Sequence, residues 1–283
     1  MVKLITVATH NELYMPWLIK SCQRYNTQIT ILGWEQKWLG FKWRYELMID
    51  YLNCIDENEI ICFIDAYDVL LLRPLDELEE IYNKIGKKII ISSENVVNNL
   101  IEFVFGQLKN SYFSLCDKKR VNAGLYVSKA KYLKDILNDL LNNYDKPEYH
   151  NDDQIMITKH CNNNKDLYYI DTKFEIFLTI FNPMFSGKNN KIKIKNQQLY
   201  YGDYRPFFIH GNGNTRLDDI ILELGYDMNN KSIKDTKIHN INTVLLKKIP
   251  TYTYLYLKPY FVEIIFIVIL LILLYRISYD KKS

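Results

Sequence analysis

The apolar residues in the first half of the chain fall into short runs separated by longer amphipathic stretches. The short runs are typical of buried strands and lie at 3–9, 28–32, 60–64, 88–92 and 120–127. The stretches between them have helical spacing and predict helices over 13–25, 41–52, 76–85 and 129–144. Two more short strands follow at 167–170 and 176–180. This alternation predicts an α/β fold with a mixed, mainly parallel sheet flanked by helices.

Three local details of these helices can also be predicted. Asn11 is a candidate N-cap for the first helix, and Asn151 is a candidate N-cap for a helix that begins near Asp152. In the helix over 41–52, the spacing of Trp43, Leu47 and Tyr51 places these side chains on one face.

The apolar run 60–64 ends in two acids, Asp65 and Asp68, with Tyr67 between them. Open α/β sheets bind ligands beyond the carboxyl ends of their strands. Two carboxylates this close in sequence can share one divalent cation, and that cation can in turn hold a diphosphate. The alternative interpretation is an Asx-type turn with both acids in solvent.

Two later segments carry similar chemistry. Asp152 and Asp153 open a helix, where acids are also favoured for purely structural reasons. His210 ends an apolar strand and is followed by Gly-Asn-Gly, which offers an imidazole ligand and exposed backbone N–H groups. A lone histidine is more often structural than a ligand, but the glycine-rich turn favours a binding role here.

Lys42 and Arg44 lie beside two tryptophans, Trp38 and Trp43. These cations could neutralise a phosphate, or their stems could simply cover apolar surface. The net charge is only +3 and no lysine- or arginine-rich block occurs, so nucleic acid is not an expected partner.

The five cysteines are scattered along the chain, and no Cys-x-x-Cys motif occurs. This pattern argues against a zinc site and predicts reduced thiols, which mildly favours a reducing compartment. At 283 residues the chain can form one large domain or two.

The C-terminal part of the chain has a different pattern. Residues 264–275 carry no charge, and tyrosines lie on both sides of this stretch, as in an aromatic belt. The pattern predicts a transmembrane helix over 259–278, although the length of the apolar stretch also fits a helix buried in a protein core. The expected organisation is a globular domain over 1–230, a linker over 231–258, the membrane span and a short basic tail over 279–283. The N-terminal apolar run is too short for a signal peptide, and the side of the membrane on which the domain lies is not predicted.

Six short segments together resemble the glycosyltransferase domain of the procollagen-lysine hydroxylases, which also underlies related collagen-type glycosyltransferases. Each segment alone is weakly specific, but all six occur in order over roughly residues 3–225. The Asp-x-Tyr-Asp and His-Gly-Asn-Gly segments are the most specific. The six are Ile-Thr-Val-Ala-Thr (5–9), Phe-Ile-Asp-Ala-Tyr-Asp-Val (63–69), Ile-Ser-Ser-Glu (91–94), Val-Asn-Ala-Gly (121–124), Asn-Asp-Asp-Gln (151–154) and His-Gly-Asn-Gly-x-Thr (210–215).

This resemblance implies a GT-A-like fold, a Mn²⁺ cofactor and a UDP-sugar donor. Asp65, Asp68 and His210 would hold the metal, and carboxylates with one imidazole suit Mn²⁺. Asp152 and Asp153 would lie near the donor sugar as catalytic candidates for hydroxyl binding or acid/base chemistry. The remaining residues that would bind the nucleotide sugar are Val7, Thr9, Lys42, Tyr67, Asn122, Gly124, Gly211, Asn212 and Gly213.

The expected function is transfer of galactose or glucose from UDP to an acceptor hydroxyl, on hydroxylysine or a glycan, by an enzyme with a C-terminal membrane anchor. The family has a tryptophan-containing segment after the Ser-Glu element, whereas residues 95–100 contain no tryptophan, so sugar or acceptor recognition can differ. A nucleotide-sugar hydrolase with the same donor site is one alternative. The other is a non-catalytic membrane protein that keeps the fold for binding, although Asp65, Asp68 and His210 are poor choices for packing alone.

Overall fold

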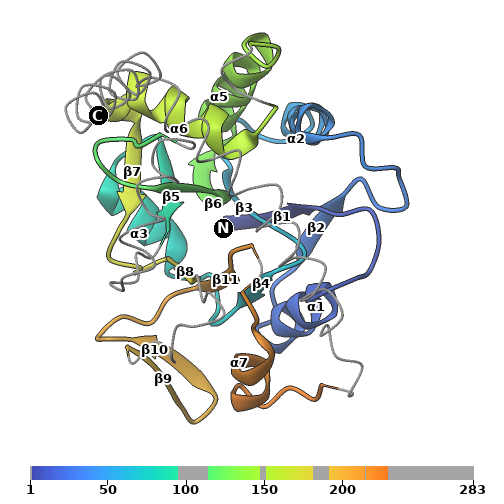
Figure 1. Ribbon diagram of the computed structural model, residues 1–283, viewed down its shortest axis with the longest axis vertical. Helices are drawn as coiled ribbons and strands as arrows, with labels where there is room; N and C mark the ends of the chain where they lie inside the picture. The colour runs from blue at the N-terminus through green and yellow to red at the C-terminus, as the bar shows by residue number, and fades with distance from the viewer. Residues whose placement is uncertain (1, 95–113, 147–150, 181–190, 214, 229–283) are drawn as a thin grey trace, which may run out of the picture.

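The computed structural model describes residues 2–94, 114–146, 151–180, 191–213 and 215–228. Its centre is a six-stranded sheet with the order β2-β1-β3-β6-β5-β7 (Figure 1). The strands are β1 (Val2–Val7), β2 (Ile29–Leu32), β3 (Ile60–Ile64), β5 (Ile89–Ser93), β6 (Val121–Lys129) and β7 (Tyr168–Asp171).

Strand β6 runs against the direction of the other strands in this sheet. It pairs antiparallel with β3 on one side and with β5 on the other, whereas β1–β2, β1–β3 and β5–β7 are parallel pairs. The predicted α/β fold with a mixed, mainly parallel sheet is therefore confirmed.

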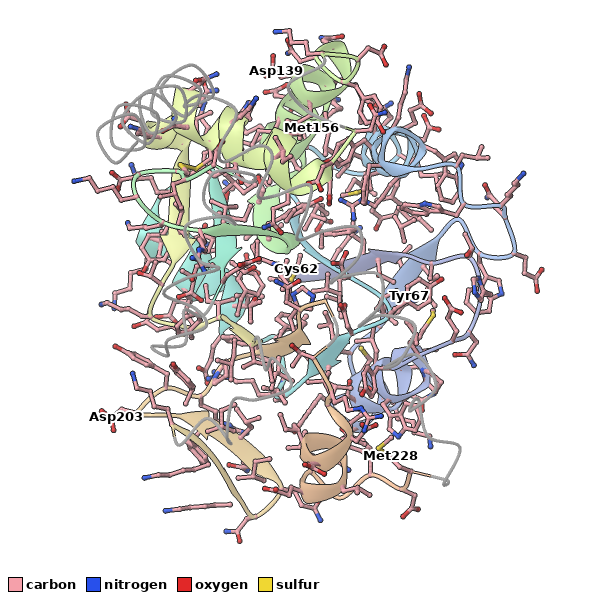
Figure 2. The ribbon with its side chains drawn as sticks, viewed as in Figure 1. Cys62, Tyr67, Asp139, Met156, Asp203 and Met228 are labelled. Carbon is pink, nitrogen blue, oxygen red and sulfur yellow. A yellow bond between two sulfur atoms is a disulfide. The ribbon has the colours of Figure 1, made fainter. Side chains whose placement is uncertain are left out.

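Helices cover both faces of the sheet and bury it between two apolar clusters. One face packs against α2 (Phe41–Asn53), α5 (Ala130–Asn142) and α6 (Asp153–Asn163), and Met156 of α6 lies in this cluster. The other face packs against α1 (Met15–Arg24) and α3 (Leu78–Ile85), and Cys62 of β3 lies in that cluster (Figure 2). Burial on both faces explains why the core strands are nearly continuous runs of aliphatic residues.

A second, three-stranded sheet adjoins the first. Its order is β4-β11-β8, where β4 (Val69–Leu71) pairs antiparallel and β8 (Phe177–Ile180) pairs parallel with β11 (Phe208–Gly211). Only residues 65–68 separate β3 in the central sheet from β4 in this one. The Asp-x-Tyr-Asp segment is thus the joint between the two sheets.

Three smaller elements complete the described chain, and the sequence patterns did not predict them. A hairpin of β9 (Ile192–Lys195) and β10 (Gln198–Tyr201) and the short helix α7 (Asp218–Glu223) contribute to a third apolar cluster beside the small sheet. A 3₁₀ turn, η2 (Lys165–Leu167), leads into β7.

One helix detail differs from the sequence predictions. Helix α1 begins at Met15, with Tyr14 as N-cap and no side-chain cap, so Asn11 is not its cap. The buried residues of α2 are Arg44, Tyr45, Met48 and Leu52, while Trp43, Leu47 and Tyr51, predicted to share one face, are all partly buried against the same core cluster.

In the part of the chain that the structure describes, no helix has the length and apolar character needed to cross a lipid bilayer. The expected span over 259–278, its linker and the basic tail lie outside the described residues. The tryptophan-free segment over 95–100 also lies outside them.

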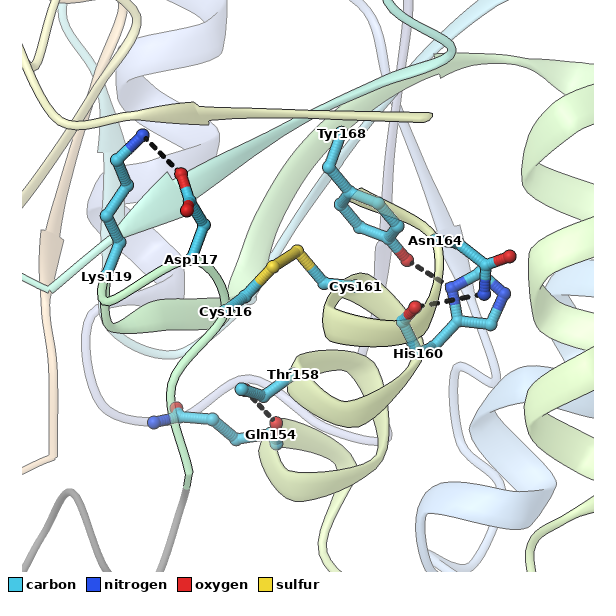
Figure 3. Close-up of a disulfide and its surroundings, with 9 residues drawn as sticks. All are labelled: Cys116, Asp117, Lys119, Gln154, Thr158, His160, Cys161, Asn164 and Tyr168. Carbon is cyan, nitrogen blue, oxygen red and sulfur yellow. Dashed lines mark hydrogen bonds and ion pairs between the residues drawn. A yellow bond between two sulfur atoms is a disulfide. The ribbon is translucent and has the colours of Figure 1, made fainter. Parts of the chain in front are cut away.

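Cys116 and Cys161 form a disulfide, so the prediction that all cysteines are reduced is wrong for this pair (Figure 3). Their Cα atoms are 5.8 Å apart although 45 residues separate them in sequence. The packing of α6 against β6 brings them together, and this contact cannot be read from cysteine spacing. Cys22 and Cys62 are buried free thiols, and Cys54 is an exposed one.

Alkylation of the unfolded, non-reduced protein should modify three of the five cysteines, and all five after reduction. Cys116→Ser should lower the free energy of unfolding by about 2–4 kcal/mol, because the opened ring restores entropy to the unfolded chain. Urea denaturation measures the loss, with the exposed Cys54→Ser as control. Modification of all five cysteines before reduction would contradict the disulfide.

Candidate functional site

The two acids of the joint and the histidine of β11 are brought together where the two sheets meet. Asp65 directly follows β3, and its backbone N–H donates to Gly124 O of β6 at 2.8 Å. Asp68 directly precedes β4, and its carbonyl accepts from the Gly211 N–H at 2.8 Å. Each end of the joint is therefore fixed to a different sheet.

The side chains of Asp65, Asp68 and His210 converge on one point. Their potential ligand atoms all lie within 4.8 Å of one another. His210 Nε2 lies 3.2 Å from Asp68 Oδ2 and 3.9 Å from Asp65 Oδ2. The imidazole is 2% exposed while the two carboxylates are 34% and 26% exposed, so the cluster opens to solvent on the carboxylate side. The three predicted metal ligands thus form a group with the donor types that a divalent cation such as Mn²⁺ accepts.

Gly124 leaves the space in which this group fits. A Cβ at this position would lie 2.5 Å from Asp65 Oδ2 and 2.8 Å from His210 Cε1. Asn122 fixes the strand at this point, because its Oδ1 accepts from the Gly124 N–H at 3.0 Å and from Ser92 Oγ at 3.2 Å. Gly124 and Asn122, predicted to bind the nucleotide sugar, lie directly behind the carboxylate–imidazole cluster.

Burial and neighbouring charges shift the pKa values of Asp65 and His210. Burial and the neighbouring Asp68 raise the pKa of Asp65 to about 7, although Arg44 and His210 act in the opposite direction. Burial alone would lower the pKa of His210, but the charges of Asp68, Asp65 and Glu94 outweigh it and raise that pKa. A divalent cation would relieve the repulsion between the carboxylates and take the place of the bound protons.

Arg44 connects this cluster to the start of α6. Its guanidinium pairs with Asp65 Oδ1 at 3.4 Å and with Asp153 Oδ2 at 2.5 Å. The sequence indicates Arg44 only as one of two cations, with Lys42, beside tryptophans, and it does not predict that Arg44 is buried. Lys42 lies on the same helix but is exposed, about 200° around the axis from Arg44.

The two acids predicted to be catalytic both have structural contacts. Asp152, and not Asn151, is the N-cap of α6, and its Oδ1 accepts from the Ile155 N–H at 3.0 Å. Asn151 instead adopts a left-handed conformation with φ +51°. Asp153 reaches the metal cluster through Arg44. Their expected position near a donor sugar and their catalytic role stay predictions.

Glu94 forms a second link between α6 and the small sheet. Its Oε1 accepts from Gln154 Nε2 at 3.1 Å and from Asn212 Nδ2 at 2.8 Å. The side chain is almost completely buried. The Ser-Ser-Glu segment was the only sequence signal for this residue, and it was not predicted to bind ligand.

The residues on both sides of Asn212 are glycines, one because the backbone packs closely there and the other because of its backbone conformation. A Cβ at Gly211 would lie 2.9 Å from Thr215 O, and Gly213 has φ +63°.

Three residues predicted to bind the nucleotide sugar, Val7, Thr9 and Tyr67, lie where β1 ends beside the joint. Tyr67 OH accepts from the Thr9 N–H at 3.0 Å, which fixes the turn that follows β1. Val7 ends β1 and is buried, as is Thr9. Tyr67 is partly exposed beside Asp68. The structure thus brings Thr9 and Tyr67 together near the cluster, and their contact with a nucleotide stays a prediction.

Gly124→Ala should weaken divalent-metal binding by at least about tenfold, because the added methyl group would displace Asp65 or His210. Isothermal titration with Mn²⁺ measures the change. Gly202→Ala is the matched control, because its Cβ would meet no atom within 4 Å. Its positive φ lowers stability but should leave metal affinity unchanged. Equal metal affinity of Gly124→Ala and wild type would contradict the assigned position of the metal.

Comparison with known proteins identifies the family. A model of the PLOD GT domain matches residues 1–232. The procollagen-lysine,2-oxoglutarate 5-dioxygenase of Drosophila melanogaster is 27% identical over 237 residues, covering 77% of this chain and 31% of that protein. The human multifunctional procollagen lysine hydroxylase and glycosyltransferase LH3 is 26% identical over 238 residues, covering 76% and 30%. This chain thus spans less than a third of the length of these curated relatives.

A crystal structure described as a glycosyltransferase involved in the glycosylation of the major capsid of PBCV-1 is also similar. It has a TM-score of 0.47 and 11% identity, covering 78% of this chain and 98% of that one.

The match of the family model extends over most of the chain and confirms the resemblance seen in the sequence. This protein therefore belongs to the PLOD GT domain family and carries the glycosyltransferase domain of that family.

Proposed function

We propose that this protein is a Mn²⁺-dependent glycosyltransferase with a GT-A-like fold that moves galactose or glucose from UDP to an acceptor hydroxyl. The observation that carries the proposal is the convergence of Asp65, Asp68 and His210 within 4.8 Å at the joint of the two sheets. The clearance at Gly124 supports it, because it leaves the ligand atoms free to approach one ion.

In this proposal, Asp65, Asp68 and His210 would hold the Mn²⁺ ion. The chemistry that the ion supplies when bound is electrostatic stabilisation of the UDP leaving group. Tyr67 of the joint and Thr9 after β1 would hold the uridine together with Val7 and Lys42. Their mutual hydrogen bond pre-forms this part of the site and lowers the entropy lost when the nucleotide binds.

The reacting sugar would lie between the metal cluster and the start of α6. The bond from the anomeric carbon to UDP breaks, and a new bond to the acceptor oxygen forms as its proton leaves. Asp152 and Asp153 are the proposed groups that accept this proton or bind the sugar hydroxyls, and Arg44 holds Asp153 Oδ2 in place. Asn122, Gly124, Gly211, Asn212 and Gly213 would shape the floor of the site.

The proposed acceptor is a hydroxyl on hydroxylysine or on a glycan. One relative, human LH3, is named both a procollagen lysine hydroxylase and a glycosyltransferase, which supports the first choice.

A membrane anchor over 259–278 is part of the same proposal and rests on the hydropathy pattern alone. A truncation that ends before residue 259 should move the protein from the membrane fraction to the soluble fraction of expressing cells.

Thermal unfolding with UDP and Mn²⁺ tests the donor site. A ligand that binds only the native state raises the midpoint, and at a hundred times its dissociation constant it adds about 2.7 kcal/mol. We expect a rise that needs both UDP and Mn²⁺, because Asp65 and Asp68 would hold the ion and the ion would supply the positive charge that the diphosphate needs. Asp68→Asn should abolish the rise, while the exposed Asp135→Asn on α5 should keep it.

Turnover tests the reaction itself. UDP release from UDP-galactose or UDP-glucose should depend on an added hydroxylysine peptide or glycan. Release at the same rate without any acceptor would instead favour a nucleotide-sugar hydrolase. No midpoint shift with UDP and Mn²⁺ in a folded sample would favour a binding protein that lacks transferase activity.

A further inference from the structure

Arg44 has an unusual position for an arginine. It is 5% exposed, on the face of α2 that packs against the central sheet, whereas arginines are seldom fully buried unless they are paired. Burial removes the hydration of the guanidinium, so its partners must replace that hydration. The structure shows two such partners, and each comes from a different part of the site.

The two partners are the carboxylates of Asp65 and Asp153. Arg44 Nη1 lies 3.4 Å from Asp65 Oδ1, and Nη2 lies 2.5 Å from Asp153 Oδ2. One carboxylate follows β3 and the other opens α6, and 87 residues separate them in the chain. A planar guanidinium can direct separate N–H groups at two acceptors, which the single ammonium of a lysine cannot do in the same geometry.

The contact with Asp65 determines how that carboxylate is turned. Oδ1 faces Arg44, and Oδ2 is the oxygen that lies 3.9 Å from His210 Nε2. Oδ2 is also the atom that a Cβ on Gly124 would strike. Arg44 therefore presents one defined oxygen of Asp65 to the point where the three metal-ligand candidates converge.

Aromatic rings hold the guanidinium in this place. Its central carbon lies 5.0 Å from the ring centre of Phe41, 5.4 Å from that of Tyr45 and 5.3 Å from that of Phe63. Phe63 belongs to β3 and stacks on Tyr126 of β6. Two of the three rings belong to α2 and one to β3, so the guanidinium is packed between the helix and the strand that leads to Asp65.

The orientation of Arg44 leaves one donor without a partner. Among the described residues, none accepts a hydrogen bond from the buried Arg44 Nε. An unpaired buried donor costs free energy, so the side chain is not placed for the largest number of hydrogen bonds. It is placed to span the two carboxylates.

We propose that Arg44 is a positioning residue that couples the metal site to the start of α6. By holding Asp65 Oδ1 and Asp153 Oδ2 together, it sets the orientation of a metal-binding carboxylate and the location of the first turn of α6. Metal binding and the placement of Asp152 and Asp153 are thereby linked. This inference rests on the proposed function, since it assigns a task to Arg44 within the same donor site.

Arg44→Lys in the full chain is the direct test, because it keeps the charge but removes the two-armed contact. With UDP present, the dissociation constant for Mn²⁺ should rise about tenfold, the lower end of the effect of losing a partner behind a metal ligand. Isothermal titration measures this change. Amide hydrogen exchange at Ile155, whose N–H bonds to Asp152, should become faster in the same variant.

Arg73→Lys is the matched control. Arg73 is also mostly buried, stacks 4.1 Å from the Phe207 ring centre and pairs with Glu77, but it lies away from the carboxylate cluster. This variant should bind Mn²⁺ and UDP as wild type does and leave exchange at Ile155 unchanged. If Arg44→Lys also binds Mn²⁺ with wild-type affinity, the inference is overturned.

A double variant, Arg44→Met with Asp153→Asn, covers the case in which Arg44→Lys does not fold. It removes both charges of the buried Arg44–Asp153 pair, so Asp153 does not remain as an unpaired buried charge, while the more exposed Asp65 is unchanged. We expect it to fold and to bind Mn²⁺ about tenfold more weakly than Asp153→Asn alone. Equal affinities would mean that Arg44 only neutralises Asp153, which would overturn the positioning role.

The outcome for the wild-type protein separates this inference from the proposed function. If wild type binds no Mn²⁺ in the presence of UDP, the proposed metal site fails, and with it the effect of Arg44 on the metal. Exchange at Ile155 then decides the link to α6, because that measurement needs no ligand. Faster exchange in Arg44→Lys would support the link, and unchanged exchange would overturn it.

Discussion

The short joint between the two sheets is the constraint on which the site depends. Residues 65–68 leave β3 in the central sheet and enter β4 in the small sheet. One end is bonded to Gly124 O and the other to the Gly211 N–H, so neither sheet can shift without moving a carboxylate. His210 lies in the strand next to β4, which places the imidazole beside the same joint. Ligand geometry here is a product of sheet packing and not of a flexible loop.

The same arrangement has a cost in free energy. Two carboxylates and a buried arginine lie in a small volume. Burial and the charge of Asp68 raise the pKa of Asp65. Buried ion pairs such as Arg44–Asp153 seldom stabilise a fold more than apolar residues of the same size would. The large apolar clusters on both faces of the sheet must supply the stability. The charged groups supply geometry.

Much of this architecture follows from local sequence pattern. Burial on both faces makes β1, β3 and β5 nearly continuous apolar runs. The acids at the end of β3 interrupt such a run at the edge where α/β sheets bind ligands, and they therefore indicate a candidate metal site. The order of the segments, and not any one of them, carried the family resemblance. The antiparallel direction of β6 has no local signature, because pairing direction is decided by how the chain returns to the sheet.

The missed features depend on contacts between distant residues. The sequence predicts Arg44 to neutralise a phosphate or to cover apolar surface, and its burial cannot be predicted because the carboxylate partners that compensate it come from β3 and α6. Asp152 caps α6 in place of Asn151 because the backbone at Asn151 has turned left-handed. The hairpin of β9 and β10 has clear alternation only in Ile192 and Ile194, which is too short to predict alone.

The disulfide closes the chain into a covalent ring that runs from Cys116 to Cys161. This ring contains Gly124 of the metal cluster and both acids at the start of α6. A single cut of the backbone inside the ring would leave the two fragments joined, so α6 would stay attached to the strand beneath the site. In the folded protein Cys22 and Cys62 are buried in the core, which leaves Cys54 as the exposed free thiol from which exchange with this bond can start.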